Sequence, residues 1–300
     1  MSSEYSRRDF MMKALTAGSA LAMTGVPVPR FAGVPFPGAD IPGRSAFLRI
    51  KPRYYRWFVA PGFDWAEMNT DYAMLDWEIP VSQAALVLVD VWNGHYLRDT
   101  NAREEAVVSN VMVPLLAACR QAGLPVIHAP SPEQAIKEPN WVRLISESEL
   151  HEEPAAWPPT AFRAKSGPYE GYRRPDEARQ HELDEIVAHR TLHPKVRPGE
   201  NEGVVATGEE LHRYCRRRGI LFLLFAGFNT NACILVRDYG TLAMSDRGYE
   251  VVLVRDATTG MESRETHSTL AQTRGATLFL EMFGRYSVAS SEVIAGLAQA

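Results

Sequence analysis

At residues 226–236 the sequence reads AGFNTNACILV, an apolar run that passes through a polar Asn-Thr-Asn loop and places Cys233 at the start of a helical pattern. A run of this kind is typical of a buried strand. A cysteine at a helix N-terminus lies at the positive end of the helix dipole, which favours the thiolate. The stretch predicts a strand, a loop and a helix that present Cys233 at a strand end. The residues alone leave open whether Cys233 is a nucleophile or a buried apolar side chain.

The same alternation of strand and helix flanks this stretch on both sides. Apolar runs occupy residues 84–90 (AALVLVD), 124–130 (LPVIHAP), 220–227, 249–258 and 276–283 (ATLFLEMF), and helical patterns occupy residues 101–123, 207–219, about 232–247 and about 263–274. Fully apolar strands that alternate with amphipathic helices predict an α/β fold whose mostly parallel sheet, of about six strands, is covered on both faces.

Three further segments differ in composition from this core domain, which we place at residues 81–300. Residues 31–80 are rich in proline and aromatic residues and predict an extended N-terminal arm, and residues 131–202 predict a long insertion or lid. Residues 1–30 contain SRRDFMMK at residues 6–13, followed by an uncharged apolar run, which resembles a twin-arginine export signal. We expect the protein to be exported to the periplasm or the extracellular space, with no membrane span in the mature chain; an N-terminal membrane anchor is the main alternative.

Composition excludes several classes of function. The chain has 300 residues, 46% of them hydrophobic, and a formal net charge of −4, so it has no basic surface of the kind that nucleic acids require. Three scattered cysteines are too few for a disulfide framework or a cysteine-based zinc site. We expect Cys119 and Cys215 to be structural, and we expect no nucleic-acid partner.

Four polar residues follow the predicted strands: Asp90, His128, Cys233 and Asp256. Ligands of an open parallel sheet bind outside the carboxyl ends of its strands, so these residues are candidates for a site. Burial would raise the pKa of Asp90 and suit its carboxylate to proton transfer. Spacing alone also allows a structural cysteine and a carboxylate that only caps a helix.

Two motifs give a resemblance to a family. LVLVDVWNGHY at residues 86–96 and LFAGFNTNACILVRDYGTLAMSDRGYEVVLVRDAT at residues 224–258 resemble the isochorismatase-like cysteine hydrolase superfamily. The resemblance implies a Rossmann-like three-layer α/β/α fold, with Cys233 as nucleophile and Asp90 as general base and acid. It also implies an oxyanion hole from the N–H groups of Ala232 and Cys233, and a cis peptide between Phe228 and Asn229.

The catalytic lysine of that superfamily, expected after the third strand, has no clear counterpart. Lys195 is the nearest lysine and the main candidate, Lys165 is a second, and His95 is a third group that could replace it. An altered triad or a loss of activity remains open.

We expect Trp92, His95, His128 and Asn229 to line the substrate pocket, although a buried structural role is the stronger expectation for His128. The stretch HAPSPEQ offers no metal-ligand spacing, so we predict no metal and no cofactor.

These observations lead to two hypotheses about function. The first is an exported cysteine hydrolase that cleaves a small amide, ureido or related C–N bond through a thioester on Cys233, with vinyl-ether hydrolysis as another reaction. The second is a binding or assembly module that retains the fold without catalysis. A depressed thiol pKa at Cys233 would favour the first. The resemblance also implies a small-molecule substrate and a homo-oligomer.

Overall fold

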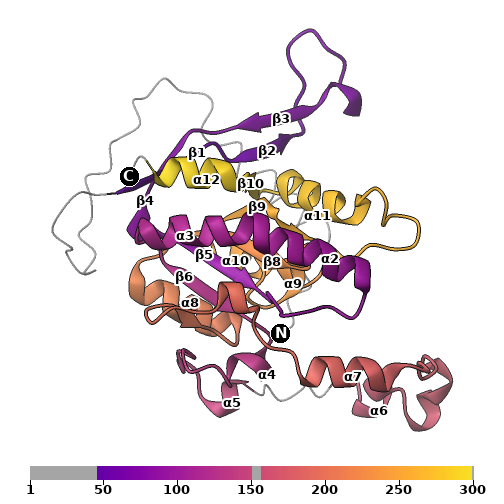
Figure 1. The fold of residues 1–300 in the computed structure, drawn as a ribbon. Helices are drawn as coiled ribbons and strands as arrows, with labels where there is room; N and C mark the ends of the chain where they lie inside the picture. Colours follow the sequence, from indigo (N-terminus) through magenta and orange to yellow (C-terminus); the bar gives the residue numbers. More distant parts are fainter. Residues whose placement is uncertain (1–45, 151–156, 299–300) are drawn as a thin grey trace.

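The structure is a computed structural model that describes residues 46–150 and 157–298, so the proposed export signal lies outside the described residues. Within this part of the chain the main sheet has eight strands in the order β3-β2-β10-β9-β8-β5-β6-β7, with helices on both faces (Figure 1). The six strands from β10 to β7 are parallel, whereas β2 and β3 are antiparallel to their neighbours. The expected α/β fold with a mostly parallel sheet is confirmed. A second sheet pairs β1 with β4.

The strands are β1 Phe47–Ile50, β2 Arg53–Arg56, β3 Asp71–Met74, β4 Trp77–Pro80, β5 Ala84–Val89, β6 Val126–Ala129, β7 Gly203–Val204, β8 Phe222–Phe228, β9 Glu250–Thr259 and β10 Tyr286–Val288. The α-helices are α2 Arg98–Val107, α3 Val113–Gln121, α4 Pro132–Ala135, α5 Glu147–Leu150, α6 Thr160–Ala164, α7 Gln180–Ala188, α8 Gly208–Arg218, α9 Cys233–Val236, α10 Thr241–Asp246, α11 Ala271–Met282 and α12 Ser290–Leu297.

Alternating side chains of the central strands form two separate cores. In β8, Leu224 and Ala226 face one cluster, which contains buried residues of α3 and α12. Leu223 and Phe225 face the other cluster, which contains buried residues of α8 and α10. Because successive side chains of a strand point to opposite faces, a continuous apolar run is the pattern that a sheet buried on both sides requires.

The described part of the expected N-terminal arm is four short strands. Two of them, β2 and β3, extend the main sheet beyond β10, which accounts for eight strands where we expected about six. β2 and β3 form a hairpin (residues 53–74) that projects at the top of the molecule in Figure 1.

Three expected elements differ in the structure. Residues 276–283 lie almost entirely in α11 and not in a strand, and the final strand β10 follows them. The helix expected at about residues 263–274 is also displaced, because α11 begins only at Ala271. The helix expected over 232–247 is divided into α9 and α10, because Arg237 has an extended backbone with ψ of 154°. A short apolar run does not distinguish a buried helix from a strand, which explains the first error.

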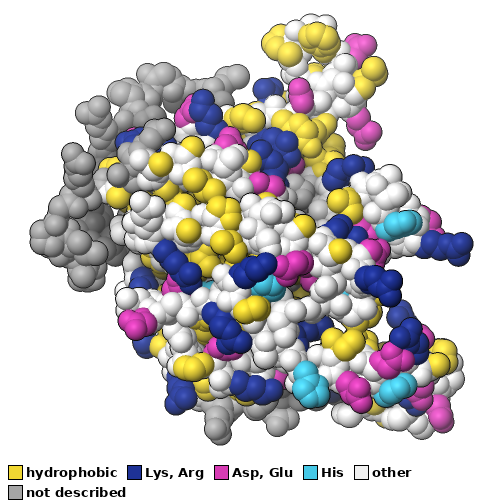
Figure 2. Space-filling model, viewed as in Figure 1, with side chains coloured by type: hydrophobic (Ala, Val, Ile, Leu, Met, Phe, Trp, Pro, Cys, Tyr) yellow, Lys and Arg dark blue, Asp and Glu magenta, His cyan; other side chains and the backbone are white. Residues whose placement is uncertain are grey.

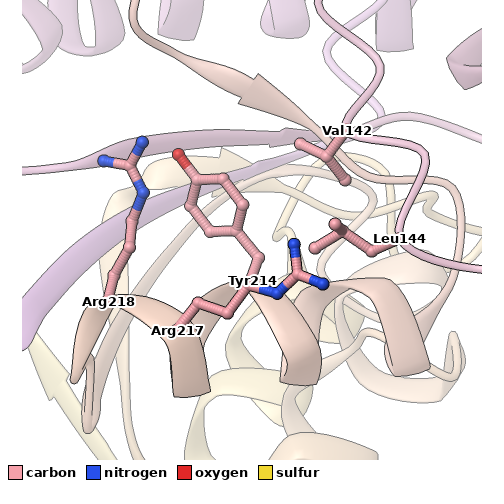
Figure 3. A pocket seen from close by; sticks show the side chains of 5 residues that line it. All are labelled: Val142, Leu144, Tyr214, Arg217 and Arg218. Carbon is pink, nitrogen blue, oxygen red and sulfur yellow. The ribbon is translucent and has the colours of Figure 1, made fainter.

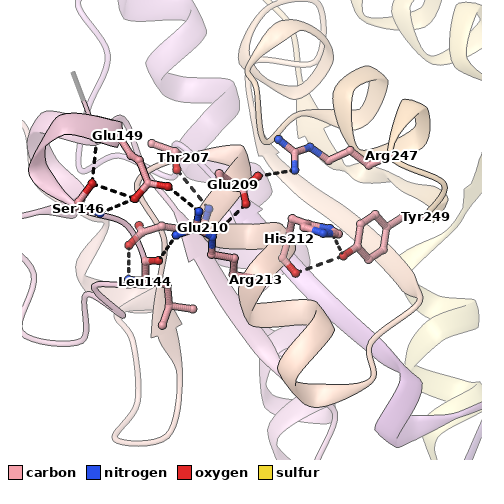
Figure 4. A network of polar contacts seen from close by, with 10 residues as sticks. All are labelled: Leu144, Ser146, Glu149, Thr207, Glu209, Glu210, His212, Arg213, Arg247 and Tyr249. Carbon is pink, nitrogen blue, oxygen red and sulfur yellow. Dashed lines mark hydrogen bonds and ion pairs between the residues drawn. The ribbon is translucent and has the colours of Figure 1, made fainter. Parts of the chain in front are cut away.

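The beginning of the insertion is fixed to α8 by a polar network (Figure 4). The buried carboxylate of Glu210 accepts hydrogen bonds from Trp141 Nε1 at 2.9 Å and from the N–H groups of Leu144 and Ala206, both at 2.8 Å. Arg213 of the same helix donates to the Leu144 carbonyl at 2.6 Å. A carboxylate with this many donors is satisfied without water, so this part of the insertion belongs to the rigid body of the domain.

Among the described residues, no helix combines the length and the apolar character that a membrane crossing requires.

Candidate functional site

The site lies where the strand order reverses. From β5 the chain continues through β6 and β7 on one side of the sheet, and β8, β9 and β10 then follow on the other side of β5. Asp90 follows β5 directly, and Cys233 opens α9 just after β8. Because β5 and β8 are adjacent and parallel, both residues emerge at the same edge, which is the place where open α/β sheets bind ligands.

Gly227 allows β5 and β8 to approach closely at this edge. Its φ is +124°, and a Cβ at this position would lie 2.0 Å from the carbonyl oxygen of Val89. The next peptide bond, Phe228–Asn229, is cis, as the resemblance implied. The sequence AGFN thus combines a close strand contact with the turn into the Cys233 loop.

The carboxylate of Asp90 is 2% exposed and has three polar neighbours. Ser131 Oγ donates to its Oδ1 at 3.2 Å, Arg237 Nη2 lies 3.8 Å from its Oδ2, and the Cys233 thiol is close enough to affect its pKa. Burial raises the pKa of Asp90 above its usual value, while Cys233, Arg237 and Ser131 oppose the increase. The expectation of a desolvated carboxylate next to the thiol is consistent with this arrangement.

The pKa of the Cys233 thiol is raised to about 11, whereas the hydrolase hypothesis predicted a depressed pKa. Burial is the main cause, followed by the negative charge of Asp90 and the hydrogen bond to it, whereas Arg237 acts in the opposite direction. α9 has only four residues, so its dipole is short. The resting site therefore holds a protonated thiol next to the side chain of Asp90.

Arg237 is the functional candidate that sequence reasoning missed. Its guanidinium donates to Ser131 Oγ at 2.7 Å, lies beside Asp90 and acts to lower the pKa of the Cys233 thiol. The residue comes four positions after Cys233, a spacing that places two side chains on the same side of a helix. The sequence contains this spacing, but the family resemblance points to a cation only after the third strand.

The two proposed oxyanion donors differ in availability. The N–H of Ala232 donates to the Asn229 carbonyl at 3.0 Å. The N–H of Cys233 is the first of α9, and a helix offers no acceptor to its first N–H groups. The Cys233 N–H is therefore the better placed donor for an oxyanion.

Neither candidate lysine reaches Asp90. Lys195 Nζ lies 2.5 Å from Glu105 Oε1 and 2.7 Å from Ser109 Oγ, so its charge is paired on α2 and the following turn. Lys165 Nζ lies 3.5 Å from the centre of the Phe162 ring in the insertion. The assignment of Lys195 to the catalytic group is wrong in this structure.

The expected pocket residues Trp92, His95 and Asn229 lie along a second charged cluster. Arg190 lies over the Trp92 ring at 5.3 Å. The pKa of His95 is lowered, mainly by the burial of its imidazole and next by the positive charge of Arg190. Asn229 Nδ2 donates to Glu104 Oε1 at 2.8 Å, and burial raises the pKa of Glu104 to about 7. A buried carboxyl group thus supports the loop that carries Cys233.

His128 does not join this cluster. Its Nε2 lies 2.9 Å from Glu202 Oε2, the imidazole is 1% exposed, and Arg120 pairs with the same carboxylate at 2.6 Å. His128 is a buried structural residue, which was the stronger expectation from the sequence. Its assignment to the substrate pocket is not supported.

A pocket of about 310 Å³ lies elsewhere, between the start of the insertion and α8 (Figure 3). Its lining residues are Val142, Leu144, Tyr214, Arg217 and Arg218. None of them contacts Asp90, Cys233 or Arg237 through a hydrogen bond or ion pair in the described part of the chain.

Comparison with known proteins decides the family. Residues 84–280, well over half of the chain, match the isochorismatase domain family. The chain belongs to the isochorismatase family. Asp90, Cys233 and Arg237 all lie within the family domain, whereas β1 to β4 precede it. No curated protein matches the chain.

Solved structures of the family are distant in sequence. A cysteine hydrolase from Pseudomonas syringae pv. phaseolicola is 17% identical, with 74% of this chain and 96% of that chain covered and a TM-score of 0.49. An isochorismatase family protein from Burkholderia thailandensis is 20% identical, with 72% and 96% covered and a TM-score of 0.44. N-carbamoylsarcosine amidase from Thermoplasma acidophilum is 16% identical, with 69% and 96% covered and a TM-score of 0.38.

Proposed function

We propose that this isochorismatase-family chain is an exported cysteine hydrolase that cleaves a small amide, ureido or related C–N bond. The observation that supports the proposal is the contact of one buried carboxylate, one thiol and one guanidinium: Asp90, Cys233 and Arg237. Each of these groups has a distinct use in acyl transfer, and together they replace the lysine-containing triad that the resemblance implied.

In the proposed reaction the Cys233 sulfur attacks the carbonyl carbon, and the thiol proton passes to Asp90. The C–N bond then breaks as Asp90 returns the proton to the leaving nitrogen, which leaves a thioester. Water attacks the thioester, Asp90 takes the proton from the water, and the thiolate leaves and is protonated again. The products are a carboxylic acid, or a carbamic acid from a ureido substrate, and an amine or ammonia.

Arg237 contributes charge and not a proton. A guanidinium is not deprotonated in proteins, and it favours whichever of its two neighbours carries the negative charge. It therefore compensates the charge that moves from Asp90 to the Cys233 sulfur as the proton is transferred. A lysine could in addition donate a proton, so Asp90 is the only proton carrier of this triad.

The test uses iodoacetamide alkylation of Cys233 between pH 7 and 10, located by mass spectrometry, together with hydrolysis of a panel of small amides. Because the carboxylate raises the thiol pKa, Asp90→Asn should increase the thiolate fraction and accelerate alkylation while it abolishes hydrolysis. Arg237→Met should raise the thiol pKa further and slow alkylation, about tenfold for each unit of pKa, and Arg237→Lys should restore most of the rate.

Two results would contradict the proposal. One is an alkylation rate that neither Asp90→Asn nor Arg237→Met changes, since the thiol would then not sense its neighbours. The other is amide hydrolysis that survives Cys233→Ala, since no thioester could then form. If both substitutions change the alkylation rate as predicted but the protein hydrolyses no amide and no vinyl ether, the non-catalytic binding module is favoured.

The proposal that the protein is exported depends only on the sequence of residues 1–30. Replacing Arg7→Lys and Arg8→Lys together should leave the protein inside the producing cell, whereas export that persists in this variant would exclude the twin-arginine route.

A further inference from the structure

The β2–β3 hairpin carries an unusually apolar exposed surface. Figure 2 shows hydrophobic side chains gathered at its tip, at the top of the molecule. Six residues of the hairpin expose between 40% and 89% of their surface: Trp57, Phe58, Phe63, Trp65, Met68 and Met74. Large side chains of this kind present about 150–250 Å² each, so the six together expose roughly 750 Å². The largest apolar patch of a monomeric protein is typically about 300–600 Å².

The hairpin is held in place by contacts that do not cover this surface. Tyr55 Oη lies 2.6 Å from Thr70 Oγ1 across the two strands, and Asn69 Nδ2 donates to the Asp64 carbonyl at 2.8 Å near the tip. At the base, Trp57 Nε1 donates to the Met282 carbonyl at the end of α11. A rigid projecting element loses little conformational entropy when it binds, which is the property of a docking element.

We infer that this hairpin is a self-association element that docks on the same hairpin of a second copy of the chain. Its exposed apolar area is close to the about 800 Å² per partner that a standard protein interface buries. β3 is an edge strand, with β2 on one side and no strand on the other in the described part of the chain. Edge strands of two copies related by a two-fold axis can pair antiparallel and continue the sheet.

The charges of the hairpin favour a second copy over other occupants. The tip carries the exposed carboxylates of Asp64 and Glu67, and β2 ends with the exposed guanidinium of Arg56. None of these three forms an ion pair within the described residues. When two hairpins lie antiparallel, the acidic tip of each faces the basic strand of the other. An acidic tip also disfavours an anionic membrane surface.

The test is the mass of the wild-type protein in solution, measured by sedimentation velocity from 0.1 to 100 μM. We expect a dimer of the 33.5 kDa chain. Replacing Trp65→Ser and Met68→Ser together should increase the dimer dissociation constant at least 100-fold, because large apolar side chains at an interface centre carry much of the binding energy. Tyr172→Ser is the matched control, since Tyr172 is 73% exposed in the insertion, and it should leave the dimer unchanged.

A charge exchange separates self-association from binding to another partner. Glu67→Arg and Arg56→Glu should each weaken the dimer, and the two together should restore it, because the complementary charges return across the two-fold axis. The Cys233 alkylation rate reports that each variant is folded. A monomeric wild type at 100 μM, whether or not it floats with phosphatidylcholine vesicles, would overturn the inference. A dimer that none of the hairpin substitutions affects would do so too.

Discussion

Glu104 makes a quantitative prediction about stability. The carboxyl group lies on α2, is 4% exposed and accepts a hydrogen bond from Asn229, next to the Cys233 loop. Burial raises its pKa from 4.5 to about 7, although Asn229, Arg190 and Arg103 oppose the increase. The folded protein therefore binds a proton at this position more strongly than the unfolded chain does.

The raised pKa determines how stability depends on pH. Between pH 4.5 and 7 the folded state holds more of this proton than the unfolded state, so the free energy of unfolding falls as pH rises. A shift of about 2.5 pKa units corresponds to about 3 kcal/mol, which is reached above pH 7 and is absent below pH 4.5. Glu104→Gln removes the charge but keeps an oxygen that accepts from Asn229. The variant should be more stable than the wild type by about 3 kcal/mol at pH 8.5 and by less than about 1 kcal/mol at pH 5.

The assay is urea unfolding followed by tryptophan fluorescence at several pH values from 5 to 8.5. The neighbouring residue supplies the control. Hydrogen bonds from Lys195, His193 and Ser109 lower the pKa of Glu105 to about 2, and its side chain is 48% exposed. Its contribution to stability is lost only as pH falls from 4.5 towards 2, and solvent screening limits it to less than about 1 kcal/mol. Glu105→Gln should therefore shift stability by a small, constant amount across this range. A difference between Glu104→Gln and the wild type that does not change from pH 5 to 8.5 would refute the reasoning.

Two more substitutions test the geometry around the site. Gly227→Ala should lower the free energy of unfolding by about 3 kcal/mol or more, because the new Cβ would meet a β5 carbonyl at 2.0 Å in a positive-φ conformation. Gly123→Ala is its control, with φ of +71° and open space around the Cβ, and should cost only about 1 kcal/mol; equal urea midpoints for the two variants would count against the close contact. Lys195→Met should leave the alkylation rate of Cys233 unchanged, because the Lys195 ammonium is paired with Glu105. A rate reduced more than threefold would indicate that Lys195 does act on the Cys233 thiol.

The local patterns that identified the fold are the ones that depend on burial alone. The runs that became β5, β6, β8 and β9 are apolar on both faces because each strand lies between two helical layers. A strand that is buried on both faces is apolar at nearly every position, so it can be predicted from its own residues without knowing which elements pack against it. Strand ends could be predicted for the same reason, and with them the positions of Asp90 and Cys233.

Predictions failed where the structure of a segment or the partner of a side chain depends on residues that are distant in the sequence. Residues 276–283 are apolar and were assigned to a strand, but they bury one side of α11. Lys195 was chosen because it is the nearest lysine along the chain, whereas its partner Glu105 is 90 positions away. Ion pairs over such separations depend on which elements the fold brings together.

The sequence by itself determined the class of fold, the family, and the strand ends that carry the carboxylate and the thiol, because apolar periodicity and short motifs are local properties of the chain. Only the tertiary structure decided which cation lies next to Asp90 and in which direction the pKa of the Cys233 thiol is shifted. The extended conformation at Arg237 ends α9 and the guanidinium lies against both groups. The pKa of Cys233 rises because burial and the neighbouring Asp90 outweigh the opposing effect of Arg237. Charge, burial and distance act through space, and the order of residues in a sequence does not contain them directly.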